Sequence, residues 1–250
     1  MTHLIAPPWG DVIGVIVTLG YVFFLMFLCK TLSDKYSSNL GRKILHMGIG
    51  FPGIFVWFLY NSTLGAVIPP IFATIMLVLA PQTLKKKFSQ GDELHTGLII
   101  YCISVSILTA LFWQNPLAHG GWIGATTLNT QHHPMENTVW IGAAAFITLA
   151  WGDGLGGTIG RKYGKHTYHI PWVKEKSLEG SLGVGLGAVF SITFSQVVFG
   201  KIFPPYVIAI ILGAVVAMVV EALSPKHTDN LFLPLSLASF LYFFRYIYLL

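Results

Sequence analysis

Long apolar runs separated by short polar connections dominate this chain of 250 residues. A helix needs roughly 20 mostly apolar residues to cross the hydrocarbon core of a bilayer. Eight runs come close to that length: 11–29, 43–60, 64–80, 96–114, 138–160, 181–200, 203–223 and 229–250. The pattern therefore predicts an all-α, polytopic integral membrane protein with about eight transmembrane helices.

The composition leads to the same class. Hydrophobic residues make up 54% of the chain and charged residues only 10%, whereas soluble domains average about 25% charged residues. The first apolar run has no basic segment before it and no small-residue cleavage site after it, so we interpret it as a retained span rather than a signal peptide. No repeat or soluble domain is evident. We therefore expect one transmembrane domain over 1–250, in contact with a lipid membrane and not with nucleic acid.

The basic residues predict the orientation of the spans. If the N-terminus is outside, 13 of the 15 Lys and Arg residues fall on the cytoplasmic side. Such an excess of positive charge inside is typical of membrane proteins. We therefore expect both termini to lie outside. The external loop 115–137 carries His119, His132 and His133, for which an ordinary connecting role is favoured over a metal site.

Unusual polar residues gather at the cytoplasmic ends of these spans. Asp153 lies late in the fifth span, where a carboxylate costs a few kcal/mol unless it is paired or hydrated. Glu221 ends the seventh span, and Asp229 and Asn230 begin the eighth. The second span opens with three further polar side chains close together on a helix, those of Arg42, Lys43 and His46. Each group alone has an ordinary structural explanation, but their joint placement favours a functional site.

The stretch GDGLGGTIGRKYGKH places glycine at every fourth position, at Gly152, Gly156, Gly160 and Gly164. Two interpretations stay open. The bare face lets another helix approach closely, or it lets a phosphate chain approach the backbone. The stretch does not have the spacing of a P-loop.

Basic residues and a helix start follow the glycines. The basic side chains could neutralise a triphosphate or serve only as topology signals; they are Arg161, Lys162, Lys165, Lys174 and Lys176. In KSLEGSLG, Ser177 or Glu179 could cap the helix that begins there. The N-terminus of that helix also attracts phosphate.

Four motifs in this order resemble the polyprenol kinase family, the CTP-dependent membrane kinases of phytol, farnesol and dolichol. They are GRKILHMGIG, AWGDGLGGTIGRKYGKH, KSLEGSLG and VEALSPKHTDNLFLPL. The phytol kinase branch is the most similar, with one departure at Leu178, where we would expect tryptophan. The resemblance implies transfer of the CTP γ-phosphoryl group to a long-chain isoprenoid alcohol dissolved in the bilayer, on the cytoplasmic (or stromal-equivalent) face, giving a lipid phosphate and CDP.

With this resemblance, we hypothesise roles for the residues above. Asp153 is the central catalytic residue, as a metal ligand or as the group that orients the hydroxyl, and His46 and Lys176 assist it. Glu179, Glu221 and Asp229 are further ligands of Mg²⁺ (or Mn²⁺). The residues expected to bind CTP are Arg42, Lys43, Gly152, Gly154, Gly156, Gly157, Gly160, Arg161, Lys165, Ser177, Gly180 and Asn230.

Two other functions stay open at this point. Cytidylyltransferases that make CDP-lipids share a weaker aspartate, glycine and EG pattern, and they attack the α-phosphate of CTP. An ion-coupled transporter could use Asp153 and Glu221 as proton or cation sites, although such proteins often contain inverted repeats, which this sequence does not show.

Overall fold

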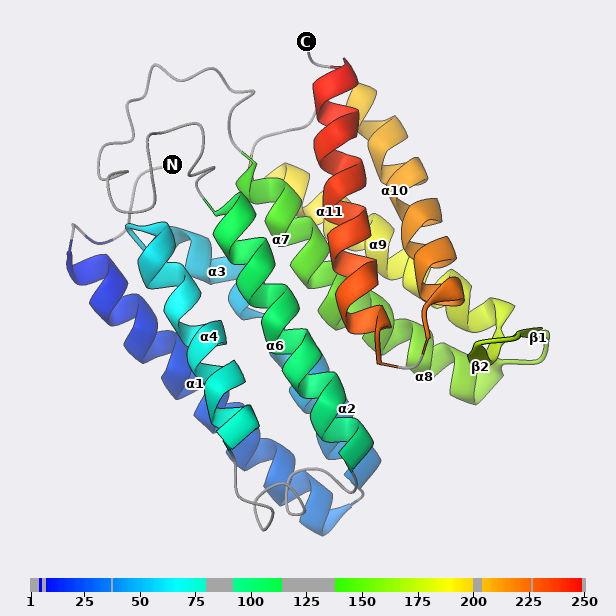
Figure 1. Cartoon of the computed structure of the whole chain (residues 1–250), viewed down its shortest axis with the longest axis horizontal. Coiled ribbons are helices and arrows are strands. Elements are labelled where there is room, and N and C mark those ends of the chain that lie inside the picture. Colours follow the sequence, from blue (N-terminus) through cyan, green and yellow to red (C-terminus); the bar gives the residue numbers. More distant parts are fainter. Residues whose placement is uncertain are drawn as a thin grey trace. The chain divides into compact units, whose positions relative to one another are not determined.

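A computed structural model describes residue 5 and residues 8–36, 38–79, 92–113, 138–199, 204–225 and 227–248. These residues are mostly helical (Figure 1). The chain divides into two compact units, residues 1–139 and 140–250. The histidines expected in the loop 115–137 lie outside the described residues.

Among the described residues, the first unit contains five helices. They are α1 (Trp9–Lys35), α2 (Ser38–Gly48), α3 (Pro52–Leu59), α4 (Thr63–Leu79) and α6 (Asp92–Phe112). Helix α1 packs against α2, α3 and α4, and α4 packs against α6. The Asp11 carboxylate of α1 accepts hydrogen bonds from the backbone N–H groups of Asn61 (2.8 Å) and Ser62 (3.0 Å). This carboxylate therefore fixes the turn between α3 and α4 to the start of α1.

The prediction of one continuous helix over 43–60 is wrong. Helix α2 ends at Gly48, and α3 begins at Pro52. Proline has no backbone N–H to donate and is well suited to the first turn of a new helix. Because glycines at positions 48, 50 and 53 also weaken a helix there, the chain breaks at this point.

The second unit is built around α9 (Leu178–Val198). Before it come α7 (Val139–Ile147), the π-helical segment η1 (Thr148–Gly152) and α8 (Asp153–Tyr163), which follow one another without a break. After it come α10 (Pro204–Leu223) and α11 (Asp229–Tyr248). Helix α9 contacts α8, η1 and α10, and α10 contacts α11.

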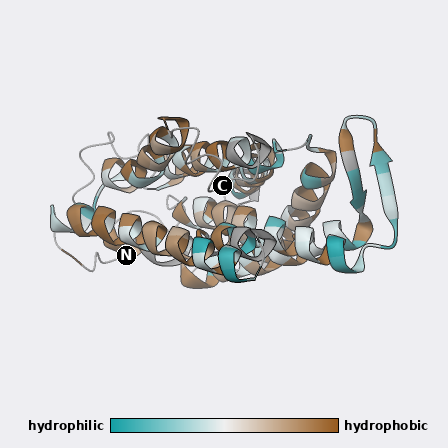
Figure 2. Cartoon of the chain, turned by 90° about the horizontal axis from the view of Figure 1, so that it is seen from below, coloured by the Kyte–Doolittle hydropathy of each residue, from teal (hydrophilic) through white to brown (hydrophobic). Residues whose placement is uncertain are grey.

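A β-hairpin joins α8 to α9 in an otherwise mostly helical structure, and the all-α prediction did not include it. Strand β1 (Thr167–Ile170) pairs antiparallel with β2 (Val173–Ser177), with Thr167 opposite Ser177 and Tyr168 opposite Lys176. Figure 1 shows the hairpin beyond the adjoining ends of α8 and α9. Figure 2 colours most of it as hydrophilic, in contrast to the mainly hydrophobic helices.

Four of the described helical stretches are long and apolar enough to cross a membrane. They are Trp9–Lys35, Val139–Tyr163, Leu178–Val198 and Tyr206–Leu223. Large apolar side chains also remain exposed on them, such as Phe27 of α1 (70%) and Leu186 of α9 (66%), as expected of helices in lipid. These features indicate a membrane protein. The count of eight spans and their orientation stay predictions.

Glycines from both helices allow α8 and α9 to pack closely. A Cβ atom built on Gly183 would lie 3.0 Å from the Cα of Gly156, and one on Gly180 would lie 3.2 Å from the Cα of Gly160. One on Gly187 would clash with the backbone of Gly152. Small residues allow such backbone approach between membrane helices. The glycine row at every fourth position therefore forms a helix–helix interface.

We expect Gly187→Ala to destabilise the second unit, because the added methyl group meets the backbone of Gly152 rather than a movable side chain. Overpacking of this kind costs about 1–3 kcal/mol, which thermal unfolding in detergent would measure. The matched control is Gly20→Ala on α1, where a Cβ would meet nothing within 4 Å. Equal stability of the two variants would contradict the glycine interface.

Candidate active site

Asp153 lies at a change of helix type. It is the first residue of α8, and its backbone N–H donates to the carbonyl of Thr148, five residues earlier, to close the π-helical turn. Short π-helical segments inside α-helices are frequent at functional sites. The segment η1 also contacts α11. The π turn therefore places Asp153 at the start of α8, directly after the segment that contacts α11.

Asp229 begins α11 and belongs to the same group of charges. Its carboxylate interacts electrostatically with Asp153, Lys176 and Glu221, and it accepts a hydrogen bond from the N–H of Asn230 (2.9 Å). The preceding turn holds His227 at a φ of 69°, a value that few residues other than glycine adopt. Strained backbone of this kind often occurs at functional sites.

Lys176 of β2 and Glu221 of α10 form the central ion pair. The Nζ atom of Lys176 lies 2.6 Å from Oε1 of Glu221 and also donates to the Glu221 backbone carbonyl. The two side chains are only 18% and 13% exposed. The second carboxylate oxygen, Oε2 of Glu221, is buried and has no hydrogen-bond partner in the structure.

The Lys176–Glu221 ion pair and the electrostatic interactions of Asp229 define the charge cluster: Asp153, Lys176, Glu221 and Asp229. Its members come from α8, β2, α10 and α11, and all lie in the second unit. With every group ionised, three carboxylates face one ammonium group. Such an excess of negative charge favours binding of a cation, and Mg²⁺ is commonly held by one or two carboxylates together with substrate phosphates.

The cluster fits a metal ion whose ligands come partly from the protein and partly from the substrate, rather than from the protein alone. Within the described part of the chain, no three His, Cys, Asp or Glu side chains are grouped so that they could hold a metal ion. The pair Asp153 and Asp229 nevertheless offers two carboxylates, and Oε2 of Glu221 offers an acceptor with no present partner. These donors are the hard oxygen ligands that Mg²⁺ prefers.

Glu179, expected as a further metal ligand, is paired with His166. One of its oxygens lies 2.7 Å from Nδ1 of His166, and the His166 backbone N–H also donates to the carboxylate. Ser177 caps α9, as its sequence position suggested: its hydroxyl accepts from the Gly180 N–H at 3.1 Å. Leu178, which follows the cap, is 55% exposed.

Five of the six glycines expected to bind CTP fall into two groups; the surroundings of the sixth, Gly154, stay untested. Gly152, Gly156, Gly160 and Gly180 lie in the interface between α8 and α9 described above. Gly157 is different, because the atoms nearest to a Cβ there belong to the Arg161 guanidinium, at 3.5 Å or more. Positions 153, 157 and 161 share one helical face, so this face of α8 carries a carboxylate, bare backbone and a guanidinium in succession.

The basic residues Arg161 and Lys162 in the last turn of α8, and Lys165 just after it, are exposed to solvent. Arg161 and Lys165 form no ion pair with the described residues, and Lys162 lies over the Tyr163 ring, 5.0 Å from its centre. The side chain of Lys174 lies outside the described part. Exposed cations such as Arg161 and Lys165 are suited to contacting phosphate.

The expected residues of the second span belong to the first unit. The His46 ring of α2 makes an edge-to-face contact with Tyr101 of α6, with ring centres 5.2 Å apart. Lys43 is half-buried, and the side chain of Arg42 lies outside the described residues. That these three join the charge cluster in one site stays a prediction.

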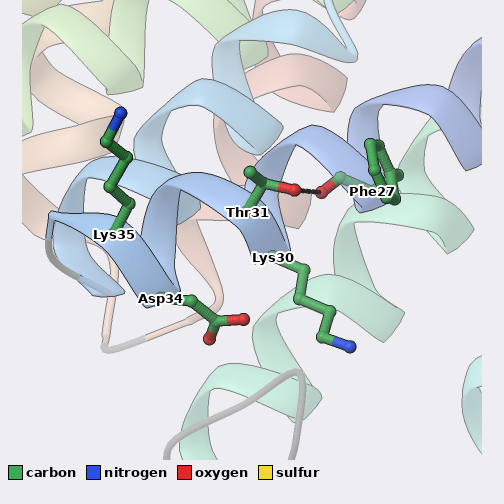
Figure 3. A pocket seen from close by; sticks show the side chains of 5 residues that line it. All are labelled: Phe27, Lys30, Thr31, Asp34 and Lys35. Carbon is green, nitrogen blue, oxygen red and sulfur yellow. Dashed lines mark hydrogen bonds between the residues drawn. The ribbon is translucent and has the colours of Figure 1, made fainter.

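A cavity of about 410 Å³ at the end of α1 is a separate feature of the first unit. Its lining consists of Phe27, Lys30, Thr31, Asp34 and Lys35. Figure 3 shows the two lysine side chains directed to different sides of α1. None of the residues predicted to act in catalysis or binding lines it.

No pattern in the sequence predicts the contacts that fix the hairpin. The Tyr168 hydroxyl lies 2.7 Å from that of Ser181 on α9, and the Trp172 indole N–H donates to the Leu223 carbonyl of α10 at 3.0 Å. Because the sequence predicts no strands between the expected spans 138–160 and 181–200, the side chains of this segment have no predicted partners.

Comparison with known proteins supports the resemblance to polyprenol kinases. The chain is 27% identical to the phytol kinase of Synechocystis over 240 residues, covering 93% of this chain and 91% of the relative. It is 28% identical to probable phytol kinase 2, chloroplastic, of rice, covering 88% and 71%. It is 24% identical to the chloroplastic farnesol kinase of Arabidopsis thaliana, covering 94% and 78%.

These similarities extend over most of the chain, and they confirm its resemblance to the polyprenol kinase family, here to members named for phytol and farnesol. No family model matches the chain, and no solved structure matches it.

We expect Lys176→Met to lower the free energy of unfolding by about 1–3 kcal/mol. Removing one member of a buried ion pair leaves the other charge unpaired, and the partial exposure of this pair reduces the cost. The double variant Lys176→Met/Glu221→Leu should recover part of the loss. Thermal unfolding without nucleotide would measure both, and a double variant that loses the full sum of the two single effects would contradict the pairing.

Proposed function

We propose that this protein is a CTP-dependent kinase that transfers the γ-phosphoryl group to a long-chain isoprenoid alcohol, with phytol the favoured acceptor and farnesol or geranylgeraniol as alternatives. The products are an isoprenyl phosphate and CDP. The observation that carries the proposal is the charge cluster, which gathers at the ends of apolar helices. Relatives named as phytol and farnesol kinases support the acceptor class.

The location of the cluster suits two substrates that differ in solubility. The alcohol is dissolved in the bilayer, and the nucleotide is dissolved in water. Charged residues at helix ends, beside a hydrophilic hairpin, form a boundary where the two can meet (Figure 2). We place this boundary on the cytoplasmic (or stromal-equivalent) face, in line with the distribution of basic residues.

Charge balance assigns the roles within the cluster. Phosphoryl transfer requires mainly positioning and neutralisation of phosphate charge, and three carboxylates alone would repel a triphosphate. Asp153 and Asp229 would hold Mg²⁺, with Glu221 as a further ligand; the ion supplies the positive charge that neutralises the phosphates. Lys176, Arg161 and Lys165 would contact the phosphate oxygens.

In the transfer itself, the alcohol oxygen forms a bond to the γ-phosphorus while the bond to the oxygen bridging the β- and γ-phosphates breaks. CDP leaves with the electrons of that bond, and the hydroxyl proton passes to water. The Asp153 carboxylate would orient the hydroxyl through this proton. His46, Lys43 and Arg42 of the first unit are proposed to assist in orienting the substrates.

The fate of the γ-phosphate of CTP tests the proposal. Purified protein in lipid nanodiscs, given Mg²⁺, phytol and CTP labelled at the γ-phosphate, should place the label in the lipid. Label released as pyrophosphate, with CMP joined to the lipid, would identify a cytidylyltransferase. Ion flux in proteoliposomes without consumption of CTP would identify a transporter.

In the same assay, Asp153→Asn should reduce turnover by at least about 100-fold, the scale on which positioned acid–base groups contribute. The matched control is Asp34→Asn, the same change at an exposed carboxylate of α1, which should retain full activity. Both variants must remain folded in detergent. Near-normal turnover of Asp153→Asn would refute the role of Asp153.

A further inference from the structure

The C-terminal end of α10 is capped by side chains of the β-hairpin. The last carbonyl groups of a helix have no partner within the helix. In α10, the Leu223 carbonyl accepts from the Trp172 indole N–H at 3.0 Å, and the Glu221 carbonyl accepts from the Lys176 ammonium group. The turn and the second strand of the hairpin are thus both attached to the last turn of α10.

The opposite side of the hairpin is attached to α9. Tyr168, which pairs with Lys176 across the strands, lies 2.7 Å from the Ser181 hydroxyl. The Leu178 N–H, at the start of α9, donates to the His166 carbonyl at 2.9 Å. The hairpin therefore bridges α9 and α10, and its position determines where the Lys176 backbone lies relative to Glu221.

Trp172 contributes to this arrangement mainly through its N–H group. The residue is 62% exposed, so burial of the ring supplies little stabilisation. The hydrogen bond to Leu223 is directional, and it holds the turn of the hairpin against α10. Since Lys176 has a long and flexible side chain, a fixed backbone is needed to keep its ammonium group at one place in the charge cluster.

We propose that Trp172 is a positioning residue for nucleotide binding: by anchoring the hairpin to α10, it places Lys176 where it can pass from Glu221 to the phosphates of CTP. This inference rests on the proposed function. It assigns to the hairpin the task of aligning the one ammonium group of the charge cluster with an incoming triphosphate.

The test is Trp172→Phe, which keeps an aromatic ring and removes the N–H donor. Because one hydrogen bond contributes about 0.5–1.5 kcal/mol, the dissociation constant of Mg²⁺·CTP, measured by calorimetry, should rise about 2- to 10-fold. The matched control is Trp9→Phe on α1, where the tryptophan is equally exposed at 63% and the affinity should not change.

A double-variant cycle separates positioning from a general structural effect. If Trp172 acts through Lys176, then Trp172→Phe should have no further effect on CTP affinity in a Lys176→Met background. The same factor lost in both backgrounds would overturn the inference, as would equal affinities of Trp172→Phe and Trp9→Phe.

Hydrogen exchange tests the anchoring without any nucleotide. Trp172→Phe should speed amide exchange across the hairpin, residues 167–177, and leave α1 unchanged. Unchanged exchange in the hairpin would refute the anchor. If the unaltered protein fails to bind CTP, the proposed function fails, and the exchange result still decides whether Trp172 holds the hairpin.

Discussion

The rest of the second unit depends on one constraint, the electrostatic interaction of three carboxylates with one ammonium group. Such a cluster is costly among apolar helices unless its charges are paired. The Lys176–Glu221 pair offsets one negative charge, and Asp229 remains under the electrostatic influence of Asp153 and Glu221. The remaining excess of negative charge supports the proposal that the site binds a metal ion together with a triphosphate.

The surrounding structure serves to hold these charges at fixed positions. Glycines bring α8 and α9 into backbone contact, the Ser177 cap fixes the start of α9, and the hairpin spans from α9 to α10. The Ser177 cap and the hairpin act on helix ends, whereas the glycine contacts extend to Gly187 in the middle of α9.

The sequence predicted those parts of the protein that depend on local pattern. The positions of most helices follow from runs of apolar residues, and the cap at Ser177 follows from its place before Gly180. The placement of Asp153, Lys176, Glu221 and Asp229 on one membrane face stays a prediction, whereas the structure shows the Lys176–Glu221 ion pair. The break between α2 and α3 was missed because the apolar run continues through Gly48 and Pro52.

Other features depend on tertiary contacts that no local pattern encodes. Glu179 has the same residue type as the other acids, but its partner is His166 from the connection that precedes it. Two further features have no local sequence pattern that predicts them. They are the π-helical turn before Asp153 and the hairpin that carries Lys176. The sequence alone could not decide between helix packing and phosphate binding for the glycine row. Only the contacts of each glycine show which positions pack against another helix.

The most direct measurement of the central claim is an experimental structure of the protein in a lipid environment with Mg²⁺ and a non-hydrolysable CTP analogue. The account predicts that the triphosphate lies in the second unit, with the metal on Asp153 and Asp229 and with Lys176 turned from Glu221 to a phosphate oxygen. A triphosphate bound away from these residues, with the Lys176–Glu221 pair intact, would contradict it.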